Sequence, residues 1–158
     1  MKYLVCKFGD DCFFIDAFCL YDEKGPAIED AMSISSPEYE PETQTVFEDL
    51  PMNKGKIFRV DADCDDELCV AEVFEIAEET KWCVIWHHGF DGVDFSCKQF
   101  TDKESALAEM SADIEDDTES FCDAWDDIEN KYSGEDTWSI DTGCEYYYWD
   151  LYEVKEGK

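Results

Sequence analysis

The chain has 158 residues, of which 42 are Asp or Glu and only 12 are Lys or Arg, so its formal net charge at pH 7 is −30. Hydrophobic residues make up 44 % of the chain and aromatic residues 15 %, a composition that can build a packed core and excludes a disordered acidic tail. So few cations among so many anions cannot form the basic surface with which a protein binds nucleic acid or an anionic membrane directly.

The length and composition predict a single domain spanning residues 1–158. The N-terminus lacks the long apolar stretch of a signal peptide, and no window approaches 18 apolar residues, so we expect a cytoplasmic protein. The nine cysteines are irregularly spaced without a CxxC pair, and the two histidines are the adjacent His87 and His88. This pattern favours reduced thiols in the core over a zinc site, with a disulfide framework as the alternative.

The first half of the chain begins with strand patterns. Residues 3–8 alternate in polarity and residues 12–21 form a second apolar run, which predicts an N-terminal hairpin across the turn at residues 9–11. Residues 22–55 hold all four prolines and nine acids, and we expect a long acidic excursion there with a short helix at residues 27–32. Residues 57–60 and 68–76 then read as two strands across an acidic turn.

The second half contains the clearest hairpin, with strands predicted at residues 82–88 and 93–100 around a glycine-containing turn. A capping-box pattern from Thr101 to Glu104 predicts a helix over about 102–116, and apolar residues at helical spacing predict a second helix over about 119–132. Residues 138–154 favour one or two strands. The order predicts an α+β fold: a mainly antiparallel sheet built from hairpins, with two helices packed on one face and no detectable internal repeat.

No pattern in the chain predicts catalysis. With 42 carboxylates, two acids lying close together carry no information, and the sequence has no GxSxG, phosphate-binding glycine loop or HExxH. A Cys–His pair is possible in principle, but nothing selects one. We therefore expect no enzyme, no catalytic residues and no cofactor.

One segment resembles a calcium-binding loop. The acids Asp61, Asp63, Asp65 and Glu72 stand at positions 1, 3, 5 and 12 of an EF-hand pattern. However, Asp66 occupies the position where the sharp turn needs Gly, and the flanks read as strands rather than helices. The segment is a weak metal candidate, and a solvated acidic turn is the favoured interpretation.

The distribution of charge is the remaining signal. From Glu104 to Glu129 there are 11 acids and no Lys or Arg, although like charges three or four residues apart on a helix cost a few tenths of a kcal/mol per pair. A folded chain of this mass exposes on the order of 8,000 Å², so the net charge averages about one per 270 Å². Duplex DNA carries about one charge per 110 Å². The candidate partner-binding acids are Asp113, Glu115, Asp116, Asp117, Glu119, Asp123, Asp126 and Asp127, followed by Glu38, Glu40, Glu42, Glu48 and Asp49 in the excursion.

In charge, size and absence of catalytic motifs, the whole chain resembles the acidic DNA-mimic inhibitors of phages and mobile elements, the anti-CRISPR and anti-restriction class. The resemblance implies a stoichiometric inhibitor in the cytoplasm of a bacterial host. Its acidic face would occupy the basic DNA- or RNA-binding site of a defence nuclease, either a CRISPR effector or a restriction enzyme. The alternatives are an acidic cytosolic domain that binds a basic protein without mimicry, a calcium-binding protein and a halophilic protein.

Overall fold

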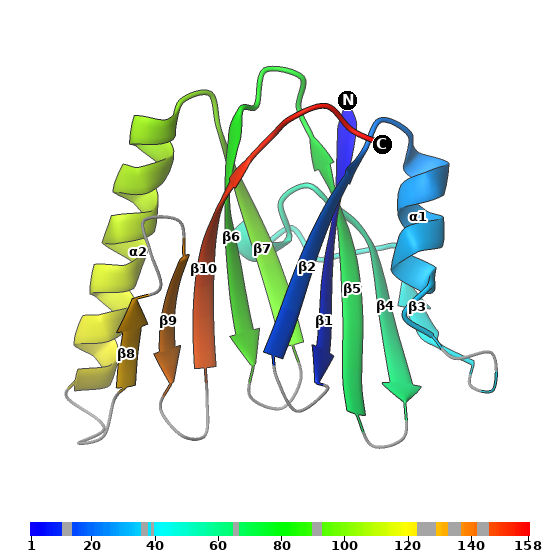
Figure 1. Cartoon of the computed structure of the whole chain (residues 1–158), viewed down its shortest axis with the longest axis horizontal. Coiled ribbons are helices and arrows are strands. Elements are labelled where there is room, and N and C mark those ends of the chain that lie inside the picture. The colour runs from blue at the N-terminus through cyan, green and yellow to red at the C-terminus, as the bar shows by residue number, and fades with distance from the viewer. Residues whose placement is uncertain are drawn as a thin grey trace. The chain divides into compact units, whose positions relative to one another are not determined.

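The computed structural model describes residues 1–10, 14–35, 38, 40–64, 67–89, 93–122, 129–132, 137–141 and 146–158. The first elements are β1 (Lys2–Asp10), β2 (Phe14–Tyr21), α1 (Lys24–Met32), β3 (Glu42–Gln44), the short 3-10 helix η1 (Pro51–Asn53), β4 (Lys56–Cys64) and β5 (Glu67–Ile76). They are followed by β6 (Trp82–Gly89), β7 (Val93–Phe100), α2 (Lys103–Cys122), β8 (Glu129–Tyr132), β9 (Thr137–Asp141) and β10 (Tyr146–Glu153) (Figure 1). The strand pairs are antiparallel, which confirms the predicted α+β fold.

The chain divides into two compact units, one made of residues 1–78 with 155–158 and the other of residues 79–154. The first unit holds α1 and a five-stranded sheet in the order β2-β1-β5-β4-β3, and the second holds α2 and a five-stranded sheet in the order β7-β6-β10-β9-β8. The single domain expected from the sequence stays a prediction, because the compactness of each unit does not decide whether the two unfold together.

In the first unit, α1 packs on one face of its sheet. Ala27 and Ala31 are fully buried and lie in one cluster with Val5, Val73 and Phe58. The alanines stand four residues apart on one side of the helix, and their small side chains let the helix approach the strands closely.

In the second unit, α2 packs in the same way through Ala106 and Met110, which cluster with Val84, Trp149 and Leu151. The helix begins at Lys103, and its first turn is capped by an Asp rather than by the predicted Thr. The Ser105 amide donates to Asp102 Oδ1 at 2.7 Å. The capping acid also lies at the positive end of the helix dipole, which favours a negative charge.

The two units repeat one topology, which the sequence analysis missed. Tyr3 pairs with Tyr21 between the first two strands of unit one, and Trp82 pairs with Phe100 between the first two strands of unit two, so both partners are shifted by 79 residues. The same offset separates the first residues of the two helices. Equivalent core positions in the two units are Val5 and Val84, Ala27 and Ala106, Ala31 and Met110, and Val73 and Leu151, the last aligned by the pairings Val5–Val73 and Val84–Leu151.

The units differ in how they connect these shared elements. The helix of the first unit has 9 residues and that of the second has 20. Residues 45–55 join β3 to β4 in the first unit, whereas only residues 133–136 join the equivalent strands β8 and β9 in the second.

The predicted helix over residues 119–132 is wrong. Helix α2 continues through Cys122, and Glu129–Tyr132 forms strand β8, in which Tyr132 pairs with Trp138 of β9. Aromatic residues opposite each other in antiparallel strands stabilise a sheet, and this pairing outweighs the local helical spacing. The two helices therefore belong to two sheets, not to one face of one sheet.

Candidate functional site: the acidic surfaces

The outer side of α2 is acidic and carries no cation. Glu104, Glu115 and Asp116 are exposed, and the residues exposed between them are small, such as Ala108 and Ala112. The sequence has no Lys or Arg from residue 104 to residue 117. The result is a helix surface, here called the α2 acidic face, on which carboxylates stand above short side chains and can be approached closely.

The side of α2 nearer the sheet is partly neutralised. Lys98 on β7 donates from Nζ to Glu109 Oε1 at 2.6 Å and to Asp113 Oδ2 at 2.9 Å. Asp113 is half-buried and belongs to an ion pair. It is one of the predicted partner-binding acids, and it shares the single ammonium of Lys98 with Glu109.

Asp117 lies at the border between these two sides and is half-buried. Burial raises the pKa of its carboxyl group, and the nearby negative charges of Asp113 and Asp116 raise it further, while His88 and Lys98 oppose the shift. The carboxylates on this part of the helix therefore repel one another in the folded state.

The remaining predicted helical acids can be placed only in part. Glu119 lies on α2, but its side chain is outside the described part of the structure. Asp123, Asp126 and Asp127 lie outside the described residues.

The five predicted partner-binding acids of the excursion are all exposed. Glu38 and Glu40 follow α1, Glu42 begins the edge strand β3, and Glu48 and Asp49 lie in the connection from β3 to β4. This second predicted set therefore spans two successive connections of the first unit rather than one continuous loop.

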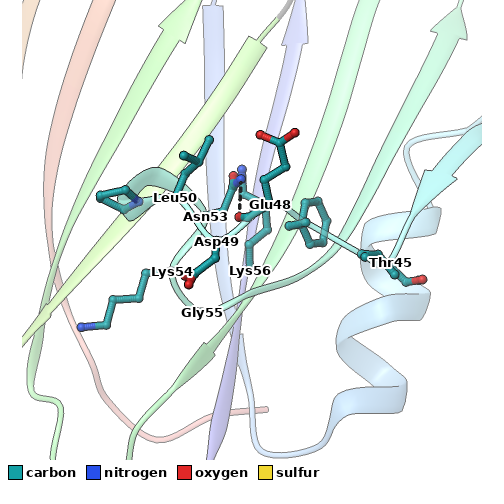
Figure 2. Close-up of a pocket in the computed structure, with 11 residues that line it drawn as sticks. Thr45, Glu48, Asp49, Leu50, Asn53, Lys54, Gly55 and Lys56 are labelled. Carbon is teal, nitrogen blue, oxygen red and sulfur yellow. Dashed lines mark hydrogen bonds between the residues drawn. The ribbon is translucent and has the colours of Figure 1, made fainter.

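The connection from β3 to β4, residues 45–55, borders a cavity of about 870 Å³ that is open to solvent (Figure 2). The cavity is lined by residues 45–51 and 53–56. Within the connection, the Asn53 side-chain amide donates to the Glu48 carbonyl oxygen at 3.1 Å. Val46 is 80 % exposed and Leu50 is 44 % exposed. The acids of this loop were predicted as partner-binding residues, but its exposed apolar side chains were not, because an apolar residue in a sequence is more often buried.

Two of the four calcium-loop candidates, Asp61 and Glu72, form ion pairs with cations of the same sheet. Asp61 accepts hydrogen bonds from Arg59 Nε and Nη2, each at 2.9 Å, and Glu72 Oε1 accepts from Lys56 Nζ at 2.7 Å and Arg59 Nη1 at 3.0 Å. These acids lie on the hairpin of β4 and β5, where the side chain of Asp63 is not described and Asp65 lies outside the described residues. Within the described residues, no group of three His, Cys, Asp or Glu side chains could hold a metal ion.

Glu72 is the centre of a buried ion network. Its side chain is fully buried, as is nearly all of the Lys56 side chain, which lies 5.6 Å from the Phe74 ring centroid. Burial raises the pKa of Glu72, and the two cations oppose that shift. The network ties β4 to β5 and serves the fold rather than a ligand.

Cys6, Cys19, Cys69, Cys83 and Cys97 form no disulfide within the described part of the chain. Among the described residues, no helix is both long and apolar enough to cross a bilayer.

No protein family, no curated protein sequence and no solved structure matches this chain.

Proposed function

We propose that this protein is a stoichiometric inhibitor that imitates nucleic acid. Its acidic surface occupies the basic DNA- or RNA-binding site of a host defence nuclease, a CRISPR effector or a restriction enzyme, in the cytoplasm of a bacterial host. The observation that supports this proposal is the α2 acidic face, where exposed carboxylates lie on a stretch of helix, residues 104–117, that contains no Lys or Arg in a chain of net charge −30.

The use of the cations supports the same proposal. Lys7 pairs with Asp30, Lys56 and Arg59 pair with Glu72, and Lys98 pairs with Glu109 and Asp113, each within its own unit. These cations hold helices and strands together within each unit, and their printed partners are not the acids of the α2 acidic face. A protein selected only for stability would benefit from lysines among those acids.

The physical mechanism is competition by charge. A groove that binds phosphates attracts any dense array of anions, and complementary potentials speed the encounter. Exposed charges are screened by salt beyond about 8 Å at physiological ionic strength. Binding to the nuclease should therefore be fast, mutually exclusive with DNA or RNA, and weakened by salt.

The test is a titration of the protein into a panel of CRISPR effectors and restriction enzymes that cleave a labelled duplex. We expect cleavage by at least one nuclease to stop near one inhibitor per binding site, and excess substrate to relieve the inhibition. Turnover of any substrate by substoichiometric protein, or the absence of inhibition across the panel, would contradict the proposal.

Charge-reversal variants test whether the α2 acidic face is the surface that binds the nuclease. The triple variant Glu104→Lys, Glu115→Lys, Asp116→Lys should lose at least about tenfold in affinity, because it removes charge complementarity at the α2 acidic face. The matched control is Glu29→Lys, Glu79→Lys, Glu156→Lys, which changes the net charge equally at exposed positions that do not belong to α2. An equal loss in both variants would mean that net charge alone, not this face, drives binding.

A further inference from the structure

The loop of residues 45–55 is longer than the topology shared by the two units requires. In the second unit the equivalent strand β8 ends at Tyr132 and β9 begins at Thr137, so the connection between them is shorter. Since both units build the same five-stranded sheet, the longer connection is not needed to form it.

This loop, here called the β3–β4 loop, exposes apolar side chains to water. Val46 is 80 % exposed and Leu50 is 44 % exposed, and Met1 is the other large apolar residue that is exposed among the described residues. Leu50 directly follows the exposed acid Asp49, and Val46 precedes the exposed acid Glu48 by two residues. Exposed apolar side chains rimmed by charge are typical of protein interaction sites.

Hydrogen bonds within the β3–β4 loop hold it in shape. The Leu50 amide donates to the Glu48 carbonyl at 2.8 Å, and the Asn53 amide donates to the Leu50 carbonyl at 2.9 Å. Gly55 has φ of 79°, a left-handed conformation that favours glycine, and its carbonyl accepts from the Glu75 amide of β5 at 2.7 Å.

A second contact anchors the middle of the loop to the scaffold. The Phe47 ring centroid lies 5.7 Å from Lys56 Nζ, the ammonium that Glu72 binds. Val46 and Leu50 are therefore exposed from a preformed loop, and ordering them on binding costs little conformational entropy.

The cavity and the charges next to the β3–β4 loop also suit a protein partner. The open cavity of about 870 Å³ lies against the loop, and Figure 2 shows the Lys54 side chain pointing away from the other labelled residues. The acids Glu48 and Asp49 are thus the exposed charges nearest to the two apolar side chains in sequence. Their sign fits a surface that carries Lys or Arg.

We infer that the β3–β4 loop is a docking element that inserts Val46 and Leu50 into an apolar pocket of the partner protein, with Lys or Arg at the rim of that pocket facing Glu48 and Asp49. The inference rests on the proposed function, because the partner is the same nuclease whose basic groove the acidic surface occupies. It adds an apolar contact whose contribution does not depend on salt, and it gives selectivity among basic proteins that charge alone does not provide.

The experiment compares two double variants of the full chain against the nuclease that the wild-type protein inhibits. Val46→Ser with Leu50→Ser should lower the affinity about tenfold or more at both low and high salt, because apolar burial is not screened. Glu48→Gln with Asp49→Asn should lower the affinity at low salt only. All four side chains are exposed, so the melting temperatures of both variants should match that of the wild type.

The outcomes separate the two proposals. Unchanged affinity of the Val46→Ser, Leu50→Ser variant for an inhibited nuclease overturns the docking loop and leaves the proposed function standing. A loss that disappears at high salt also overturns it, since the loop would then act only through charge. If the wild-type protein inhibits no nuclease in the panel, both proposals fall.

Discussion

At the scale of single residues, Glu72 illustrates how an acid-rich chain uses its few cations. A carboxylate removed from water is unfavourable unless it is paired, and here one carboxylate oxygen accepts from both Lys56 and Arg59. The same sequence position was a candidate calcium ligand, because a sequence does not show which acids are buried. The structure distinguishes it from the exposed acids by its partners and its burial.

Neutralising Glu72 should destabilise the protein strongly. In Glu72→Gln the buried Lys56 ammonium loses its anion, and breaking a buried ion pair from one side costs about 3–5 kcal/mol. Urea unfolding at pH 7 measures the loss in the free energy of unfolding. Asp61→Asn is the matched control: Asp61 binds the same Arg59 but is 41 % exposed, so its loss should stay below about 1 kcal/mol. Equal effects would mean that the network is not held by burial.

At the scale of elements, the strands were easier to predict than the helices. Alternating polarity identified the hairpins of β1 with β2 and of β6 with β7, because a half-buried strand imposes a period of two on the sequence. The end of α2 was missed because helical spacing of aromatic residues continues through a segment that pairs as strand β8. The sequence also did not show which acids form ion pairs, because the Lys98 ion pairs join residues from different elements.

The carboxylates on α2 should make stability depend on pH in a defined direction. The folded-state pKa of Asp117 is raised by burial and by its acidic neighbours, so the folded protein binds this proton more tightly than the unfolded chain. The contribution of Asp117 to stability is therefore fully present below its unfolded pKa and is lost as the pH rises through its folded pKa.

Asp117→Asn tests this directly. Relative to the wild type, the variant should gain stability as the pH rises from about 4 to neutrality, by less than about 1 kcal/mol because the group is partly exposed. Urea unfolding at several pH values measures the difference, and added salt should reduce it. A variant that becomes less stable than the wild type at neutral pH would contradict the assigned repulsion.

At the scale of the whole molecule, the repeated topology is hard to detect in the sequence because equivalent core positions keep their burial, while only some of them, such as Ala27 and Ala106, keep their residue type. Ala31 corresponds to Met110, and side-chain volume at one position is compensated at others in each core. The fold class could be predicted from local patterns, but the division into two sheets depends on long-range strand pairing, which those patterns do not encode.

Whether the two units unfold together can be measured with the tryptophans. All five lie in residues 79–154, so tryptophan fluorescence reports on the second unit. If the chain is a single cooperative domain, as its sequence predicts, Glu72→Gln in the first unit should shift the fluorescence transition as far as the circular dichroism transition. A fluorescence transition that stays at the wild-type midpoint would show independent units.

Because the registers of the two sheets match, each unit can serve as an internal control for the other. Ala27 and Ala106 hold the same position on the same kind of helix, in one polypeptide and one solution. A substitution made first at one and then at the other compares two environments with temperature, ionic strength and net charge held constant.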